Sequence, residues 1–423
     1  MAIILSRGTR VILMLIFLCL PVMFIKAQEE ENVSSEIVIT ATKTETKIRD
    51  VSGVLEVISA DDAKKVNVIN VSDLFKTMAG VDLQGGGLPG SEVRLNFRGL
   101  TPGYQSKRVL VLVDGRRLND QYQGNPEMAL IPADSIERIE VLKGPASALY
   151  GSNAMGGIIN IVTKRGTETP VTIIRGAGGS HNTSHYRVSH GSKKGNVDDF
   201  VSASHIRTDG YLNNSDGTDR DWESWNVDGN VGIILSDKSE IRIFAGDYEG
   251  EGTDENSERD AHRDYAAARY TLEFPAGSHD GKLELMLYRN GERQEYEWKY
   301  PGEGIYDQYT VGGEIQCSMW MSDRDLITAG VDGRREDVDI DEVQNDIDEH
   351  TSIVSFYLQD EMYLGEIFKI TAGARYDDSD DYDSELSPRL GVLMRISPDC
   401  ELFASANRAH REPALSDRYV KTV

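Results

Sequence analysis

The feature that most constrains the fold is a repeated alternation of apolar and polar residues across residues 166–423. Two representative segments are 283–288 and 390–396, where every second residue is apolar. Such alternation gives a strand one apolar face and one mixed face, which suits a wall between lipid and a water-filled interior. A soluble β-sandwich produces the same pattern, so the alternation alone leaves both folds open.

The lengths of the links between these segments favour a barrel. Short links are expected at 191–196, 236–239, 275–281, 321–325, 364–366 and 397–400, and they alternate with long polar links at 208–221, 247–264, 292–304, 335–350 and 377–385. This alternation places the long loops at one end of an up-and-down sheet, as in outer-membrane barrels. We expect about 13 strands, whereas a plugged transporter barrel has about 22 and an open edge is not tolerated in lipid. The chain is therefore expected to stop inside its barrel.

Composition excludes some functions. The chain has 45 basic and 70 acidic residues, a formal charge of −25. A nucleic-acid partner is not expected, because such proteins need a basic face. No Gly-x-Ser-x-Gly elbow or comparable catalytic pattern occurs, so no enzymatic activity is expected.

Residues 1–27 have the pattern of a signal peptide. Arg7 and Arg10 precede an apolar run from Val11 to Ile25, and Ala27 is the expected cleavage site. The run is shorter than the ~20 residues of a spanning helix, which argues against an anchor. Export would allow Cys317 and Cys400 to pair, and the sequence leaves that pairing open.

Residues 36–165 predict a small α+β domain. Short strands at 54–59, 93–97, 108–113, 136–142 and 158–163 alternate with short helices that begin near Ser59 and Asn70. The glycine-rich stretches 85–87 and 144–157 lack the pattern of a phosphate-binding loop. We expect them to let the backbone pass close to a neighbouring wall.

Three stretches of this domain resemble the plug domain of TonB-dependent outer-membrane receptors. They are 93–100 (VRLNFRGL), 109–118 (VLVLVDGRRL) and 131–164 (IPADSIERIEVLKGPASALYGSNAMGGIINIVTK). The residues that carry the resemblance are Arg94, Arg98, Gly99, Asp114, Gly115, Glu137, Arg138, Glu140, Lys143, Gly144, Pro145, Tyr150, Gly151, Gly156, Gly157 and Asn160. The resemblance implies a plug domain at 46–165, followed at 166–423 by part of an antiparallel transmembrane β-barrel, about 13 of about 22 strands.

The resemblance also gives a meaning to residues 36–42. By themselves they form an unremarkable β-branched strand, or one that adds to another protein's sheet edge. A similar segment in the family is the TonB box, which binds the periplasmic energy transducer TonB. The residues concerned, within a segment spanning 28–45, are Glu36, Ile37, Val38, Ile39, Thr40, Ala41 and Thr42.

The function implied by the resemblance is energised uptake of a scarce small molecule across the outer membrane of a Gram-negative bacterium. The expected ligand is a ferric siderophore, with cobalamin or haem next, and the receptor is expected to be a lipid-embedded monomer. Loops at the top of the plug would contact the ligand, through Gln84, Tyr104 and Gln105.

Acidic segments leave two other hypotheses open. Asp216, Asp219 and Asp221, and the acidic run 377–385, offer oxygen ligands for calcium, although neither follows the EF-hand spacing. A calcium-dependent secreted adhesin would explain this acidity but not the plug resemblance. A passive porin would need neither a plug nor a TonB box.

Overall fold

The computed structural model describes residues 37–38, 41–65, 71–76, 78–85, 93–97, 108–126, 128, 131–210, 220–253, 257–277, 279–298, 302–342, 345–397 and 400–419. The chain divides into two units, Met1–Ser35 and Glu36–Val423, and all described residues belong to the second. The predicted signal peptide therefore lies outside them. Over the described ranges, no helix combines the length and apolarity needed to cross a bilayer.

The first part of the described chain alternates short strands and short helices, as expected. Its elements are β1 (Ile37–Val38), β2 (Thr46–Lys47), η2 (Ile48–Asp50), β3 (Val54–Ser59), α2 (Ala60–Lys65), α3 (Ser72–Phe75), β4 (Val81–Gly85), β5 (Val93–Phe97), β6 (Val109–Val113), β7 (Arg116–Arg117), η4 (Ala133–Ser135), β8 (Ile136–Lys143), α4 (Ser147–Tyr150) and β9 (Gly157–Thr163). A five-stranded sheet has the order β3-β8-β9-β6-β7, while β1-β2 and β4-β5 form separate pairs.

Local sequence explains these elements. Helix α2 begins with the predicted capping box, since the Asp62 backbone N–H donates to Ser59 Oγ (3.2 Å) and the Ser59 N–H donates to Asp62 Oδ2 (3.3 Å). Strand β6 is buried along its whole length. Val111 packs in one apolar cluster and Leu110 in another, so both faces of the sheet are covered. This accounts for the continuous apolar run in the sequence.

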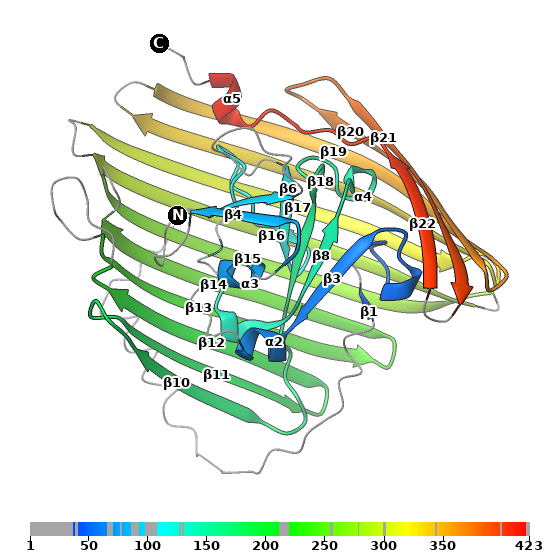
Figure 1. Cartoon of the computed structure of the whole chain (residues 1–423), viewed down its shortest axis with the longest axis horizontal. Helices are drawn as coiled ribbons and strands as arrows, with labels where there is room; N and C mark the ends of the chain where they lie inside the picture. Colours follow the sequence, from blue (N-terminus) through cyan, green and yellow to red (C-terminus); the bar gives the residue numbers. More distant parts are fainter. Residues whose placement is uncertain are drawn as a thin grey trace. The chain divides into compact units, whose positions relative to one another are not determined.

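The second part is one antiparallel sheet of 13 strands, which confirms the predicted fold class. The strands are β10 (Val171–Gly178), β11 (Ser184–Lys194), β12 (Val197–Thr208), β13 (Trp222–Ser236), β14 (Ser239–Thr253), β15 (Ser257–Ala276), β16 (His279–Trp298), β17 (Glu303–Trp320), β18 (Asp325–Glu342), β19 (Asn345–Leu364), β20 (Phe368–Ser379), β21 (Glu385–Ser397) and β22 (Cys400–Asn407). Each strand pairs with its neighbour in the chain (Figure 1).

The short links fall where they were predicted, but in three of the predicted long links most of the described residues lie in strands. Residues 247–264 lie mostly in β14 and β15, 292–304 in β16 and β17, and 335–350 in β18 and β19. Backbone pairing continues past the apolar zone because it does not depend on side-chain polarity. Opposite charges then meet across strands, as in the ion pair of Arg289 with Asp264.

The two faces of this sheet differ as the alternation predicted. On β19, Phe356 and Leu358 are exposed, whereas Ser355, Gln359 and Glu361 are buried on the opposite face. That buried polar face is the one that contacts residues 41–165, for example through the hydrogen bond from Gln359 to the Thr42 carbonyl.

Candidate functional site

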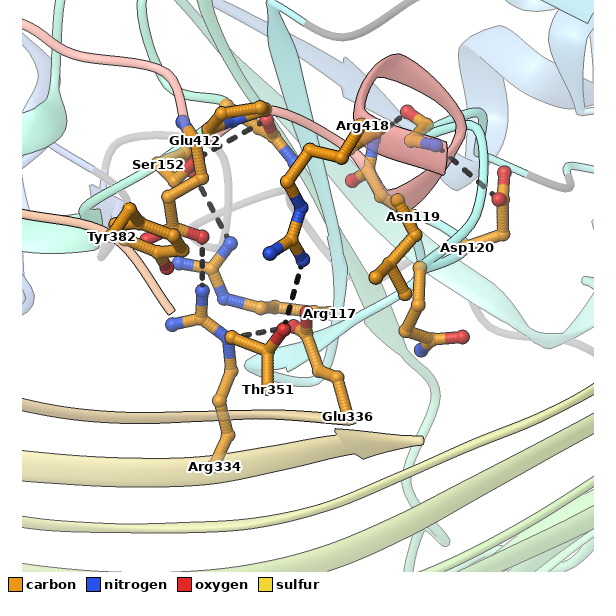
Figure 2. Close-up of a pocket in the computed structure, with 16 residues that line it drawn as sticks. Arg117, Asn119, Asp120, Ser152, Arg334, Glu336, Thr351, Tyr382, Glu412 and Arg418 are labelled. Atoms are coloured by element: carbon orange, nitrogen blue, oxygen red, sulfur yellow. Dashed lines mark hydrogen bonds and ion pairs between the residues drawn. The ribbon is translucent and has the colours of Figure 1, made fainter. Parts of the chain in front are cut away.

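A hollow lies where the plug meets the inner face of the large sheet (Figure 2). It is formed by five parts of the chain that are distant in sequence: residues 117–124, residues 152–153 after α4, strands β18 and β19, Tyr382, and residues 412–418. The last of these includes the short helix α5 (Leu415–Tyr419). Its lining is mainly polar, with Arg117, Asp120 and Arg334 among the charged residues.

The loop 119–126 is held rigidly by its own side chains. Asn119 accepts a hydrogen bond from the Val111 N–H (2.8 Å) and donates to the carbonyl oxygens of Val109 (3.0 Å) and Gly124 (2.9 Å). The Asp120 carboxylate accepts backbone N–H groups of residues 123–125, at 2.5 to 3.2 Å. The loop thus presents a fixed surface to the hollow.

This loop binds to strand β17 of the large sheet and to residues 415–416. Gln308 Oε1 on β17 accepts hydrogen bonds from the backbone N–H groups of Gln121 (3.1 Å) and Tyr122 (2.9 Å). The Ser416 N–H donates to the Tyr122 carbonyl (3.0 Å), and Leu415 packs in the apolar cluster that contains Tyr122. Contacts from both sides therefore fix the shape of the hollow.

Opposite charges balance most of the guanidinium groups around the hollow. Arg334, whose side chain is 3% exposed, lies 2.7 Å from both Glu336 and Glu412. Arg418 pairs with Asp381 at 2.6 Å. Arg117 instead donates to the carbonyl oxygens of Ser152 (3.2 Å) and Tyr150.

Burial raises the pKa of the Asp120 carboxyl to about 7, and the nearby charge of Glu292 acts in the same direction. The N–H groups of Gln123 and Asn125 oppose this shift, because they stabilise the carboxylate. Asp120 is therefore only partly ionised near neutral pH.

A second hollow is lined by the other face of residues 116–121. Strands β13–β17 form its wall, with Tyr265 and Glu292 among the lining residues. The Arg116 guanidinium lies 3.7 Å from the centre of the Tyr265 ring, a cation–π contact. Arg117 and Asp120 line both hollows, so the loop after β7 divides them.

The segment 41–50 is anchored to the wall through both its backbone and its side chains. Side chains of four strands donate to its carbonyl oxygens: Gln316 to Lys43 (2.9 Å), Gln359 to Thr42 (3.3 Å), Lys369 to Asp50 (3.0 Å) and Arg389 to Ala41 (3.0 Å). Lys43 also forms an ion pair with Glu314, and its ammonium lies 4.3 Å from the centre of the Tyr357 ring.

This anchor and the first hollow lie toward opposite ends of strand β19. On β19, Thr351 lines the hollow while Glu361 accepts a hydrogen bond from Thr44 (3.3 Å). At ~3.3 Å per residue the two positions are about 33 Å apart. The anchored end is also the end of the short turn between β19 and β20.

The predicted TonB box is only partly described. Ile37 and Val38 form β1, and Val38, Ala41 and Thr42 are at most 2% exposed. Glu36, Ile39 and Thr40 lie outside the described residues.

The predicted plug residues mainly hold the plug together. The Asp114 carboxylate accepts hydrogen bonds from the Thr163 N–H (3.0 Å) and hydroxyl (2.8 Å), while Asp114 and Gly115 form the turn after β6. The fully buried Glu140 pairs with Arg138 at 2.9 Å, and Lys143 pairs with Glu56 at 2.5 Å. The others in described segments are Arg94, Glu137, Gly144, Pro145, Tyr150, Gly151, Gly156, Gly157 and Asn160, whereas Arg98 and Gly99 lie outside them.

The residues predicted to contact a ligand or a metal are not brought together in the described part of the chain. Gln84 lies in β4, opposite Arg94 of β5, and Tyr104, Gln105, Asp216 and Asp219 are outside the described ranges. Asp221 is exposed.

The acidic run 377–385 contacts other residues of the protein; for example, Ser355 Oγ donates a hydrogen bond to the Asp377 carboxylate (2.7 Å). A different trio, Asp247, Glu249 and His262, places its ligand atoms within 4.8 Å of one another. Cys317 and Cys400 are both free thiols.

Sequence reasoning missed the residues that line the hollows. Arg117 belongs to the quoted stretch 109–118, so its neighbourhood was recognised without its role. Arg334 and Arg418 lie in segments that carry no motif. Only the fold brings these three residues together around one space (Figure 2).

Comparison with known proteins gives two family matches. Residues 47–158 match the family model described as "TonB-dependent Receptor Plug Domain", and residues 173–422 match "TonB dependent receptor-like, beta-barrel". Similar curated proteins include "Vitamin B12 transporter BtuB" of Photobacterium profundum, 24% identical over 95% of this chain, and "Iron-regulated outer membrane virulence protein" of Vibrio cholerae, 25% identical over 92%. The chain spans 66% and 62% of their lengths.

Solved structures with the same fold include the siderophore receptor PirA from Pseudomonas aeruginosa and the copper transporter OprC. PirA has a TM-score of 0.68 at 22% identity, with 85% of this chain and 62% of that chain covered. OprC has a TM-score of 0.74 at 16% identity, with 86% and 66% covered.

Proposed function

Because the chain belongs to the TonB-dependent receptor family, a family of outer-membrane proteins in Gram-negative bacteria, we propose that it serves energised uptake of a scarce small molecule. The observation that carries the proposal is the arrangement of two sites along strand β19. A polar hollow lies at one end, and the anchored segment 41–50, next to residues 36–42, lies at the other. This separation suits a protein that binds a ligand on one side of a membrane and a partner on the other.

We assign four parts to the chain on this basis. Residues 1–27 are a signal peptide, 28–45 carry the TonB box, 46–165 form the plug and 166–423 form barrel wall. The partner is TonB, which would pair with residues 36–42 by strand addition. Burial of Val38, Ala41 and Thr42 means that this segment must leave the wall before such pairing.

The expected ligand is a ferric siderophore, followed by cobalamin or haem, and the comparisons add a metal ion to this range. The names of the similar proteins support this range, since they include a vitamin B12 transporter, siderophore receptors and a copper transporter. The rigid loop 119–126 and the first hollow form the ligand site of the proposal. Gln84, Tyr104 and Gln105 remain proposed contacts, and calcium at Asp216, Asp219 and Asp221 remains a separate proposal.

Deletion of residues 36–42 tests the proposal in cells that carry the receptor gene. We expect loss of uptake of iron complexes or cobalamin, while binding of the same compound at the cell surface is unchanged. Deletion of residues 29–35, a segment of equal length that leaves the TonB box intact, is the matched control and should preserve uptake. Uptake that survives the first deletion would refute the role of residues 36–42.

A further inference from the structure

Arg117 differs from the other arginines around the first hollow in the groups that surround its charge. Its guanidinium donates only to main-chain carbonyl oxygens, those of Ser152 and Tyr150. No carboxylate of the described residues lies within 4.0 Å of it, whereas Arg334 and Arg418 each have such a partner. Carbonyl oxygens orient the group but leave its formal charge unmatched.

The surroundings of Arg117 oppose its positive charge. Burial and the neighbouring Arg334 both lower its pKa, and Tyr288, Glu412 and Asp332 offset this only in part. Asp120 supplies little additional negative charge, because its carboxyl is only partly ionised near neutral pH and its oxygens already bind the N–H groups of residues 123–125. An anion that enters the hollow would therefore supply the negative charge that the surroundings of Arg117 lack.

Arg117 is also placed so that a ligand can reach it. It lines both hollows at the loop that divides them. Figure 2 shows its guanidinium directed to the same space as those of Arg334 and Arg418. A guanidinium offers paired N–H donors in a plane, a geometry that matches two oxygens of an anionic group.

We propose that Arg117 selects ligands that present anionic oxygen atoms, such as the carboxylate or phenolate oxygens of a metal chelate. This inference rests on the proposed function and narrows its ligand class. A neutral ligand of similar size would leave the charge of Arg117 buried and unmatched, so the site would disfavour it. Arg117 thereby acts as a specificity-determining residue of the hollow.

Titration of the detergent-solubilised chain, followed by tryptophan fluorescence, provides the test. The probes are ferric citrate and a ferric tris-catecholate, both anionic, and ferrichrome and cyanocobalamin, both neutral overall. We expect an anionic probe to bind at least tenfold more tightly than either neutral one, with affinity that falls as salt is added. Arg117→Met should weaken that binding about 10- to 150-fold, the range for a hydrogen bond to a charged group.

Two variants separate the selective role from a structural one. Arg117→Lys keeps the charge but loses the paired donors, so its affinity for the anionic probe should lie between those of the unaltered protein and Arg117→Met. Arg335→Met removes an exposed arginine that pairs with Asp337 away from the hollow, and it should leave binding unchanged. The salt dependence of the unaltered protein needs no variant, so it tests the inference even if Arg117→Met fails to fold.

The outcomes distinguish this inference from the proposed function. Tight binding of a neutral probe that salt and Arg117→Met leave unchanged would overturn the anion site and leave the receptor function standing. If none of the four probes binds, the proposed function itself fails, and the anion site fails with it.

Discussion

Replacement of Gly157 by alanine should loosen the plug more than the same change at Gly80. Both glycines have positive φ, +155° at Gly157 and +74° at Gly80, so a side chain at either position is strained by ~1–2 kcal/mol. At Gly80 an added Cβ would meet no atom within 4 Å. At Gly157 it would lie 2.3 Å from the Leu142 carbonyl oxygen and 2.6 Å from the Phe97 ring.

The difference between the two variants is the energy of overpacking. Backbone and a buried ring cannot move aside cheaply, which adds ~1–3 kcal/mol at Gly157. Amide hydrogen exchange in β6, β8 and β9, read by mass spectrometry, reports local opening of the plug. We expect exchange in Gly157→Ala to be about 5- to 150-fold faster than in Gly80→Ala. Equal rates in the two variants would refute the reasoning from close contact.

Three further predictions test other parts of the structure. Lys369→Met leaves the fully buried Glu361 without the ammonium that lies 2.5 Å away, so it should lower the free energy of unfolding by ~3–5 kcal/mol. The double variant with Glu361→Leu should recover most of that loss, and urea titrations measure both effects. The folded state holds a proton on Asp120 that the unfolded chain releases, so the free energy of unfolding should fall as pH rises from about 4 to about 7. If Asp120→Asn shows the same dependence of this free energy on pH as the unaltered protein, the reasoning is contradicted. Cys317 and Cys400 should both titrate as thiols after denaturation without reductant, and a disulfide detected there would contradict the structure.

The fold could be predicted because its signals are local or repeat along the chain. The capping box of α2, the buried run of β6 and the turn at Asp114–Gly115 each depend on a few adjacent residues. The 13 strands follow from period-two alternation that the membrane-facing zone enforces.

Two features could not be predicted in this way. Beyond the apolar zone the alternation is lost, because charged residues occupy both faces, yet backbone pairing continues. Residues 247–264 were therefore expected as a loop, whereas 247–253 and 257–264 lie in strands. The hollows depend on residues such as Arg117, Arg334 and Arg418, which are adjacent only after the plug has docked against the wall.

The anchor of segment 41–50 has a consequence for how this region tolerates mutation. Gln316, Gln359, Lys369 and Arg389 bind carbonyl oxygens, which every amino acid provides. Substitutions in the anchored segment can therefore accumulate without loss of these four hydrogen bonds, provided that the backbone path is kept. The four wall residues tolerate substitution less well, since each must keep a side-chain N–H donor long enough to reach the carbonyl oxygen. Among relatives, sequence drift should thus be faster at exposed positions of the anchored segment, such as Lys47 and Arg49, than at the four wall positions that hold it.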